Sequence, residues 1–139
     1  MDASLLRSSF DLIALDKDQF AKAFYLRLFE KYPQTRPLFA NTDMPKQART
    51  LSAILALVVS GVERGDDLTP TLQSLGTRHK TYGVLPEHYP IVGEVLIETF
   101  QNRLGPQWTT AFQEAWIEAF TVIAQVMSAE SVGVATPQV

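Results

Sequence analysis

The sequence of 139 residues contains no cysteine, and this absence excludes several kinds of site. Without thiols the chain forms no disulfide, no thiolate nucleophile, no zinc or iron–sulfur site built on cysteine, and no thioether-linked cofactor. Any cofactor would therefore be held without a bond to cysteine sulfur.

A surplus of basic residues and a long hydrophobic run are also missing. The formal net charge is -3 at pH 7, which gives no basic footprint for nucleic acid or an anionic membrane. No apolar stretch is long enough to span a bilayer, and the first residues lack the basic start and apolar run of a signal peptide. We therefore expect a soluble, cytoplasmic protein that binds neither nucleic acid nor a membrane.

The composition that remains is that of one globular, helical domain. The chain is 46% hydrophobic and long enough to bury a sizeable core. Apolar residues recur at spacings of three and four, without a strand pattern or a repeat. The prediction is an all-α domain over residues 1–130, followed by a flexible tail over residues 131–139. Helical segments are expected at residues 3–15, 16–32, 33–39, 43–65, 69–82, 89–104 and 107–129.

Local signals predict where three of these helices begin. Asp16 followed by Gln19 resembles a capping box. Asp43 is placed to cap the helix that follows it, and Thr69 before Pro70 is typical of a cap and a first helical position. These side chains would then satisfy amide N–H groups in the first turns of their helices.

His79 lies on the apolar side of its predicted helix. Leu75 is one turn before it and Leu72 two turns before it, so the three residues share one face. Gly83 and Pro86 end the helix soon afterwards. A neutral imidazole held in this way is able to bind a metal, but a single histidine on an apolar face is more often a core residue satisfied by a carbonyl. The segment by itself leaves both interpretations open.

Two polar side chains on apolar helix faces need a partner. Gln47 lies four residues before Leu51 and brings an amide onto an otherwise apolar face. Its burial without a hydrogen bond would cost about 1–3 kcal/mol, so Gln47 should face a partner or an occupied cavity unless it lies in solvent. Tyr25 belongs to the stripe AFYLRLF and could direct its hydroxyl inward or to the surface. Phe39, the last apolar residue before a loop, is by default a core phenylalanine.

Four stretches, taken in order, resemble the globin family over nearly the whole chain. They are AFYLRLFEKYPQTRPLF, QARTL, LGTRHKTYGVLPEHYPIVG and EAWIEAFTVIAQVM. The similarity is to single-domain bacterial globins related to the haem domain of flavohaemoglobins. It implies a globin fold of about seven to eight helices in a three-over-three arrangement. It also implies haem b between the third long helix and the helix of His79.

The resemblance implies roles for individual residues. His79 would be the proximal iron ligand, Phe39 the aromatic residue packed on the porphyrin, and Leu51 an apolar neighbour on the distal side. Tyr25 and Gln47 match the distal pair of this subfamily, which stands in place of a distal histidine. Each is able to donate a hydrogen bond of about 1–3 kcal/mol to iron-bound O2, so slow release of O2 is expected.

Tyr89 matches a tyrosine that family members place beside the proximal histidine. There it and a late glutamate hydrogen-bond to the second ring nitrogen and make the iron more electron-rich. The position of the glutamate falls on Ser131, and Glu130 lies one residue before it. Because of this departure, the resemblance does not decide whether the iron would be made strongly electron-rich. His88 is expected to be an exposed residue at a helix start, not a second ligand.

The expected function is reversible binding of O2, and also of CO and NO, by a haem globin. The alternative is an NO dioxygenase that converts NO and bound O2 to nitrate with a separate reductase, because we expect no flavin or nicotinamide module in this chain. No catalytic side chain is assigned. A sensor is less favoured because no output domain is expected, and a helical bundle without a cofactor is the remaining alternative.

Overall fold

A computed structural model describes the backbone of residues 1–133 and the side chains of residues 1–129. Every regular element in this part of the chain is a helix, so the predicted all-α class is confirmed. The α-helices are α1 (Ala3–Asp11), α2 (Lys17–Lys31), α3 (Met44–Arg64), α4 (Thr69–Thr81), α5 (His88–Leu104) and α6 (Thr110–Gly133). Short 3-10 helices are η1 (Ala14–Asp16), η2 (Pro33–Phe39) and η3 (Gly105–Gln107).

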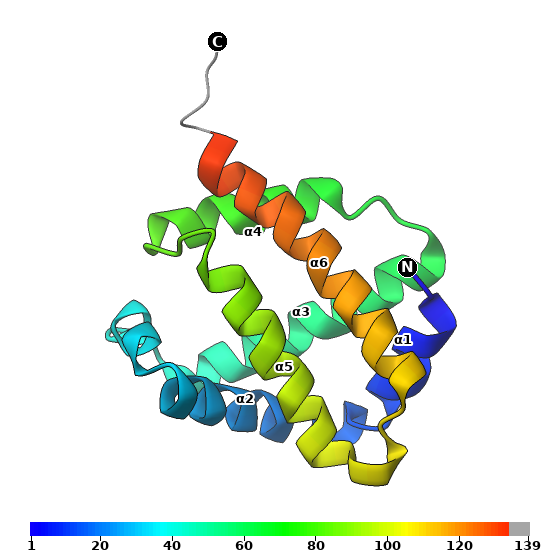
Figure 1. The fold of residues 1–139 in the computed structure, drawn as a ribbon. Coiled ribbons are helices and arrows are strands. Elements are labelled where there is room, and N and C mark those ends of the chain that lie inside the picture. Colours follow the sequence, from blue (N-terminus) through cyan, green and yellow to red (C-terminus); the bar gives the residue numbers. More distant parts are fainter. Residues whose placement is uncertain (134–139) are drawn as a thin grey trace.

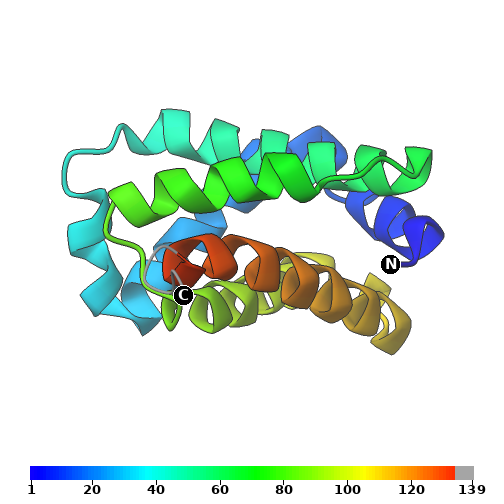
Figure 2. The same cartoon turned by 90° about the horizontal axis from the view of Figure 1, so that it is seen from above.

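The long helices are stacked in two layers, and Figure 1 shows how they cross. Figure 2 shows α3 and α4 in one layer and α5 and α6 in the other. α4 packs on α6, α2 packs on both α3 and α5, and α1 lies against α3 and α6. Within the described part of the chain, none of the helices combines the length and the hydropathy needed to cross a bilayer.

Trp116 of α6 lies at the centre of the main core and is fully buried. Its ring centroid is 5.0 Å from that of Phe100 on α5, which in turn is 4.6 Å from that of Phe20 on α2. The indole Nε1–H donates to the buried Ser9 hydroxyl on α1 at 2.7 Å. One aromatic side chain thus joins elements from both ends of the sequence.

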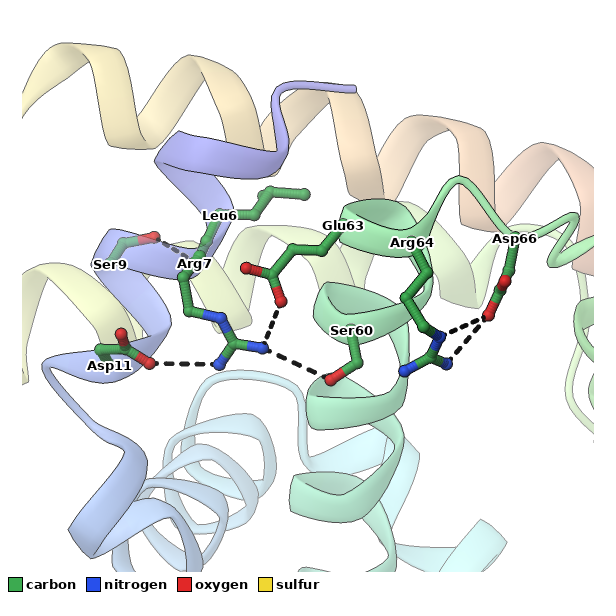
Figure 3. A network of polar contacts seen from close by, with 8 residues as sticks. All are labelled: Leu6, Arg7, Ser9, Asp11, Ser60, Glu63, Arg64 and Asp66. Carbon is green, nitrogen blue, oxygen red and sulfur yellow. Dashed lines mark hydrogen bonds and ion pairs between the residues drawn. The ribbon is translucent and has the colours of Figure 1, made fainter.

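Arg7 ties α1 to the last turn of α3, as Figure 3 shows. Its guanidinium donates to Glu63 at 2.6 Å and to Asp11 at 3.1 Å, with a longer bond to the Ser60 hydroxyl at 3.4 Å. These bonds raise the pKa of Arg7 further above its ordinary value, first through Glu63. Exposed ion pairs contribute little to stability, so we expect this network to orient α1 on α3 more than to stabilise the fold.

The first helix is shorter than predicted. It ends at Asp11, and the amides of Leu12 and Ile13 then bond to carbonyls three residues earlier, at 3.2 and 2.9 Å. This tighter turn buries Ile13 and leaves Leu15 in solvent. The apolar residues that suggested one helix as far as Leu15 therefore belong to two elements.

Two of the three predicted caps are wrong. Asp16 makes no cap bond, because its carboxylate pairs with Arg103 of α5 instead. α4 begins at Thr69 itself, and the Asp67 carboxylate accepts the Thr69 N–H at 3.0 Å. Asp43 is confirmed as a cap, since it accepts the amide N–H three residues later at 3.2 Å.

The last helix begins later and continues further than predicted. η3 intervenes, and α6 starts at Thr110, where the Thr109 hydroxyl accepts an amide N–H three residues later at 3.1 Å. α6 runs to Gly133, so residues 131–133 of the expected tail are helical. The rest of that predicted tail, residues 134–139, lies outside the described residues.

Candidate functional site

His79 lies near the end of α4, with its ring partly buried. Its Nδ1 atom is 2.8 Å from the carbonyl oxygen of Leu75. This bond uses only one ring nitrogen, because Nδ1–H donates to the carbonyl and Nε2 keeps its lone pair. Burial lowers the pKa of His79; the Leu75 bond opposes this effect and Arg78 adds to it. The imidazole is therefore neutral near pH 7 and able to bind a metal through Nε2.

Tyr25 of α2 and Gln47 of α3 are in direct contact. Gln47 Nε2 donates to the Tyr25 hydroxyl oxygen at 3.0 Å. The Tyr25 side chain is 7% exposed, and burial raises the pKa of its phenol to about 12, against an opposing effect of the Gln47 amide. The phenol is therefore protonated at neutral pH. Among the hydrogen bonds of the described residues, the Tyr25 hydroxyl accepts from Gln47 and donates to no side chain or carbonyl.

Phe39 and Leu51 border the same region. The Phe39 ring, at the end of η2, is 5.4 Å from the Tyr25 ring and meets it edge-on. Leu51 lies one turn after Gln47 on α3, and both Leu51 and Phe39 are partly buried against the main core. The structure thus brings the predicted distal residues together between α2, η2 and α3.

Ile54 connects this region to the helix of His79. It lies on the same side of α3 as Gln47 and packs against an apolar cluster that contains Leu75. Leu75 is also the residue whose carbonyl holds the His79 ring. Ile54 has no predicted role in the site, although its position seven residues after Gln47 puts both on one face of α3 and is the signal that could have indicated it.

Tyr89, in the first turn of α5, packs against the same apolar cluster, which consists of Leu72, Leu75 and Met127. This cluster joins α4 to α6, and the Nδ1 atom of His79 is bonded to the Leu75 carbonyl. A direct bond between Tyr89 and His79 stays a prediction. The side chains of the other two residues of that prediction, Glu130 and Ser131, lie outside the described residues.

His88 has a local structural role at the start of α5. Its Nδ1 atom accepts the Leu85 N–H at 2.9 Å, which holds the corner between α4 and α5. The ring is partly buried, not exposed as predicted, because it folds back on this corner.

A groove of about 520 Å³ lies between α5 and α6. Pro86, Tyr89 and Phe120 are among its lining residues. Neither His79 nor the pair of Tyr25 and Gln47 lines it, so this groove is separate from the region in which the other predicted site residues gather.

The metal-binding side chains of the described residues fit a metal ion whose other ligands belong to a cofactor. His79 offers one nitrogen, and the described part of the chain has no group of three or more His, Asp or Glu side chains that could hold a bare ion. Haem iron, with four porphyrin nitrogens and one protein imidazole, matches this chemistry.

The fold is that of a globin. A family model described as Globin matches residues 22–127, and the chain therefore belongs to the globin family. The predicted family and the globin fold are both confirmed.

Among curated relatives, the flavohemoprotein of Pseudomonas aeruginosa is 30% identical over 97% of this chain and 36% of its own length. The flavohemoprotein of Bacillus subtilis is 26% identical over 86% of this chain and 31% of its own length. The chain thus spans about a third of the length of these proteins. Neuroglobin of Danio rerio is 26% identical over 91% of this chain and 88% of its own length.

Solved structures show the same architecture. An engineered carbene transferase from Rhodothermus marinus, whose description also names a nitric oxide dioxygenase, has a TM-score of 0.82 at 28% identity, covering 96% of this chain and 92% of that one. A bacterial globin from Campylobacter jejuni has a TM-score of 0.80 at 21% identity, covering 96% of both chains. The second likeness concerns the fold alone.

Proposed function

We propose that this chain is a haem-binding globin that reversibly binds O2, and also CO and NO. The observation that carries the proposal is the buried Tyr25 hydroxyl, which accepts from Gln47 and, among the hydrogen bonds of the described residues, donates to no side chain or carbonyl. A hydroxyl that accepts one hydrogen bond is still able to donate its own proton, so a polar guest would be held by a second bond. Bound O2 accepts hydrogen bonds and is such a guest.

Each site residue has a distinct task in this proposal. Haem b would supply iron that, with one protein ligand, keeps a coordination position for a gas. His79 would bind the iron through Nε2 while the Leu75 carbonyl fixes its ring. Phe39 would pack on the porphyrin, Leu51 would border the distal side, and Tyr89 would support His79 from the proximal side.

Retention of O2 depends on the distal pair in this scheme. The pKa of Tyr25, about 12, keeps its phenol protonated and able to donate throughout the physiological range. Gln47 donates to the Tyr25 oxygen at 3.0 Å, which fixes the phenol and directs its proton away from the amide. Slow release of O2 follows from this arrangement.

NO dioxygenation is the second candidate, favoured by the likeness to flavohemoproteins and to the Rhodothermus marinus protein. In that reaction NO and O2 form nitrate with the uptake of one electron, which a separate reductase would supply. Tyr25 and Gln47 would hold O2 in place for the attack. Either role suits a cytoplasmic protein.

Haem uptake tests the first proposal. The purified protein should absorb as a haem protein, with a Soret band that shifts on addition of CO. The His79→Ala variant should lose haem or that spectrum, whereas His88→Ala, which changes the other histidine, should keep both. A chain that takes up no hemin would overturn the proposal.

Mixing the oxygenated protein with NO in a stopped-flow instrument separates the two roles. Rapid oxidation followed by re-reduction with a cellular reductase and NADH supports dioxygenation. Oxidation that no reductase reverses leaves reversible gas binding as the function.

A further inference from the structure

Two segments that are far apart in the sequence meet at one end of the molecule. A Cβ atom placed on Gly83, in the corner after α4, would lie 3.6 Å from Leu38 of η2. Figure 1 and Figure 2 both show η2 and this corner at the same end of the helical stack. The two segments therefore lie at one end of the molecule, which we call the corner surface and define by Arg36 of η2, by Arg78 and Lys80 near the end of α4, and by Tyr82 and Leu85 after it.

The centre of the corner surface is apolar and exposed. Tyr82 is 64% exposed and Leu85 is 50% exposed, whereas the other three tyrosines of the chain are buried or partly buried. Exposed apolar side chains that are grouped together and bordered by polar residues are typical of a protein–protein contact.

The border of the corner surface is positively charged. The sequences of η2 and of residues 77–86 contain three cations, Arg36, Arg78 and Lys80, and no Asp or Glu; the first carboxylate after them is Glu87. The ion pairs of the described side chains engage other cations, namely Arg7, Lys31, Arg64 and Arg103. Arg36, Arg78 and Lys80 take part in none of these ion pairs, so their charge is not neutralised by a carboxylate among the described side chains, although the whole chain carries a net charge of -3.

The helix dipole explains only part of this charge. Cations at the end of a helix are stabilised by its negative end, which accounts for Arg78 and Lys80 on α4. It does not account for Arg36, which comes from η2 and lies over the Phe29 ring at 5.2 Å. Nor does it account for the exposure of Tyr82 and Leu85.

The corner surface is also the part of the exterior next to the proposed iron ligand. The ring centroid of Tyr82 is 6.3 Å from that of His79. A protein docked on Tyr82 would therefore bring its own redox group close to the iron that His79 is proposed to bind. Complexes for electron transfer are small and are guided by complementary charge.

We infer that the corner surface docks an electron-donor protein whose own redox group is surrounded by acidic residues. The inference rests on the proposed function, because it names the kind of reductase that would deliver electrons to this haem. Positive charge around Tyr82 would steer the acidic face of the donor, although the net charge of the chain would repel it elsewhere. Tyr82 and Leu85 would form the dry centre of the contact.

Reduction of the ferric, hemin-loaded protein by reduced flavodoxin, an acidic flavoprotein, tests this inference. At low ionic strength we expect Arg36→Glu, and separately the double variant Arg78→Glu/Lys80→Glu, to slow reduction about tenfold. Added salt should slow the unmodified protein, because it screens the attraction. Lys22→Glu, which changes an exposed cation on α2, is the matched control and should leave the rate near that of the unmodified protein.

A neutral small reductant, photoreduced 5-deazariboflavin, separates docking from damage at the haem site. It should reduce all variants at similar rates, since it needs no charged surface. The inference would be overturned if the charge-reversal variants were reduced equally slowly by both reductants. It would also be overturned if Lys22→Glu slowed reduction by flavodoxin as much as they do. Arg36→Glu keeps the test decisive if the changes beside His79 disturb haem binding.

Direct binding gives a readout that does not depend on electron transfer. On titration with oxidised flavodoxin, backbone amide signals of η2 and residues 82–85 should shift in NMR spectra, and the shifts should vanish in Arg36→Glu. Shifts elsewhere only would overturn the inference. Failure of hemin uptake would instead overturn the proposed function, so the two failures are distinguishable.

Discussion

The replacement Tyr25→Phe removes the one hydroxyl on which the proposed gas binding depends and preserves the ring. Tyr25 is 7% exposed, so its phenol donates a hydrogen bond in a largely dry environment. If that bond contributes about 1–3 kcal/mol to the retention of O2, its loss should speed O2 release by roughly five- to 150-fold. CO is less polar when bound, and its release should change much less.

Stopped-flow displacement measures both rates on the ferrous protein, with CO replacing O2 and NO replacing CO. Tyr32→Phe is a matched control, because the Tyr32 hydroxyl donates to Glu94 at 2.6 Å outside the distal region. It should leave both rates unchanged. Equal acceleration of O2 and CO release in Tyr25→Phe, or no acceleration, would refute the argument that the phenol donates to the gas.

Gln47 offers an internal check of the same argument. Because its amide donates to the Tyr25 oxygen at 3.0 Å, the two side chains should not act independently. The effects of Gln47→Leu and Tyr25→Phe on O2 release should therefore differ from their sum in the double variant. Strict additivity would mean that Gln47 does not position the phenol.

Two further predictions concern stability. Ser9→Ala removes the acceptor of the buried Trp116 N–H and should lower the free energy of unfolding by about 1–3 kcal/mol in urea, whereas the exposed Ser4→Ala should be nearly neutral. Burial lowers the pKa of His79, so below about pH 6.5 the unfolded chain takes up a proton more readily than the folded one. The hemin-free protein should therefore lose stability as pH falls through that value and keep it above, and His79→Gln should reduce this slope in urea titrations at several pH values.

The fold was predictable from the sequence where local chemistry decides the outcome. Asp43 caps α3, and α3 ends at Gly65, which adopts a φ of 71° that few other residues tolerate. The cap predicted at Asp16 fails because Arg103, 87 residues further along the chain, takes its carboxylate. Propensity at Asp16 contains no information about that partner.

In the candidate site, too, local features were predictable from the sequence and contacts between distant residues were not. The sequence indicates that Tyr25 and Gln47 each need a partner, but not that they bond to each other across 22 residues. The corner surface has no sequence signal, because η2 approaches the corner at Gly83 only in the folded chain, through Leu38. Pairing between helices is a property of packing, which periodicity along one helix does not describe.

His79 shows why two competing interpretations of a residue need not exclude each other. A core histidine satisfied by a carbonyl and a metal ligand are alternatives as long as the ring is treated as one group. The bond of 2.8 Å from Nδ1 to Leu75 engages one nitrogen and fixes the tautomer in which Nε2 is unprotonated. The contact that satisfies the core histidine is therefore the one that prepares it as a ligand. What distinguishes the two cases is whether Nε2 faces a bound haem. If His79→Ala keeps haem and its Soret spectrum, the proposal that His79 binds the iron is refuted.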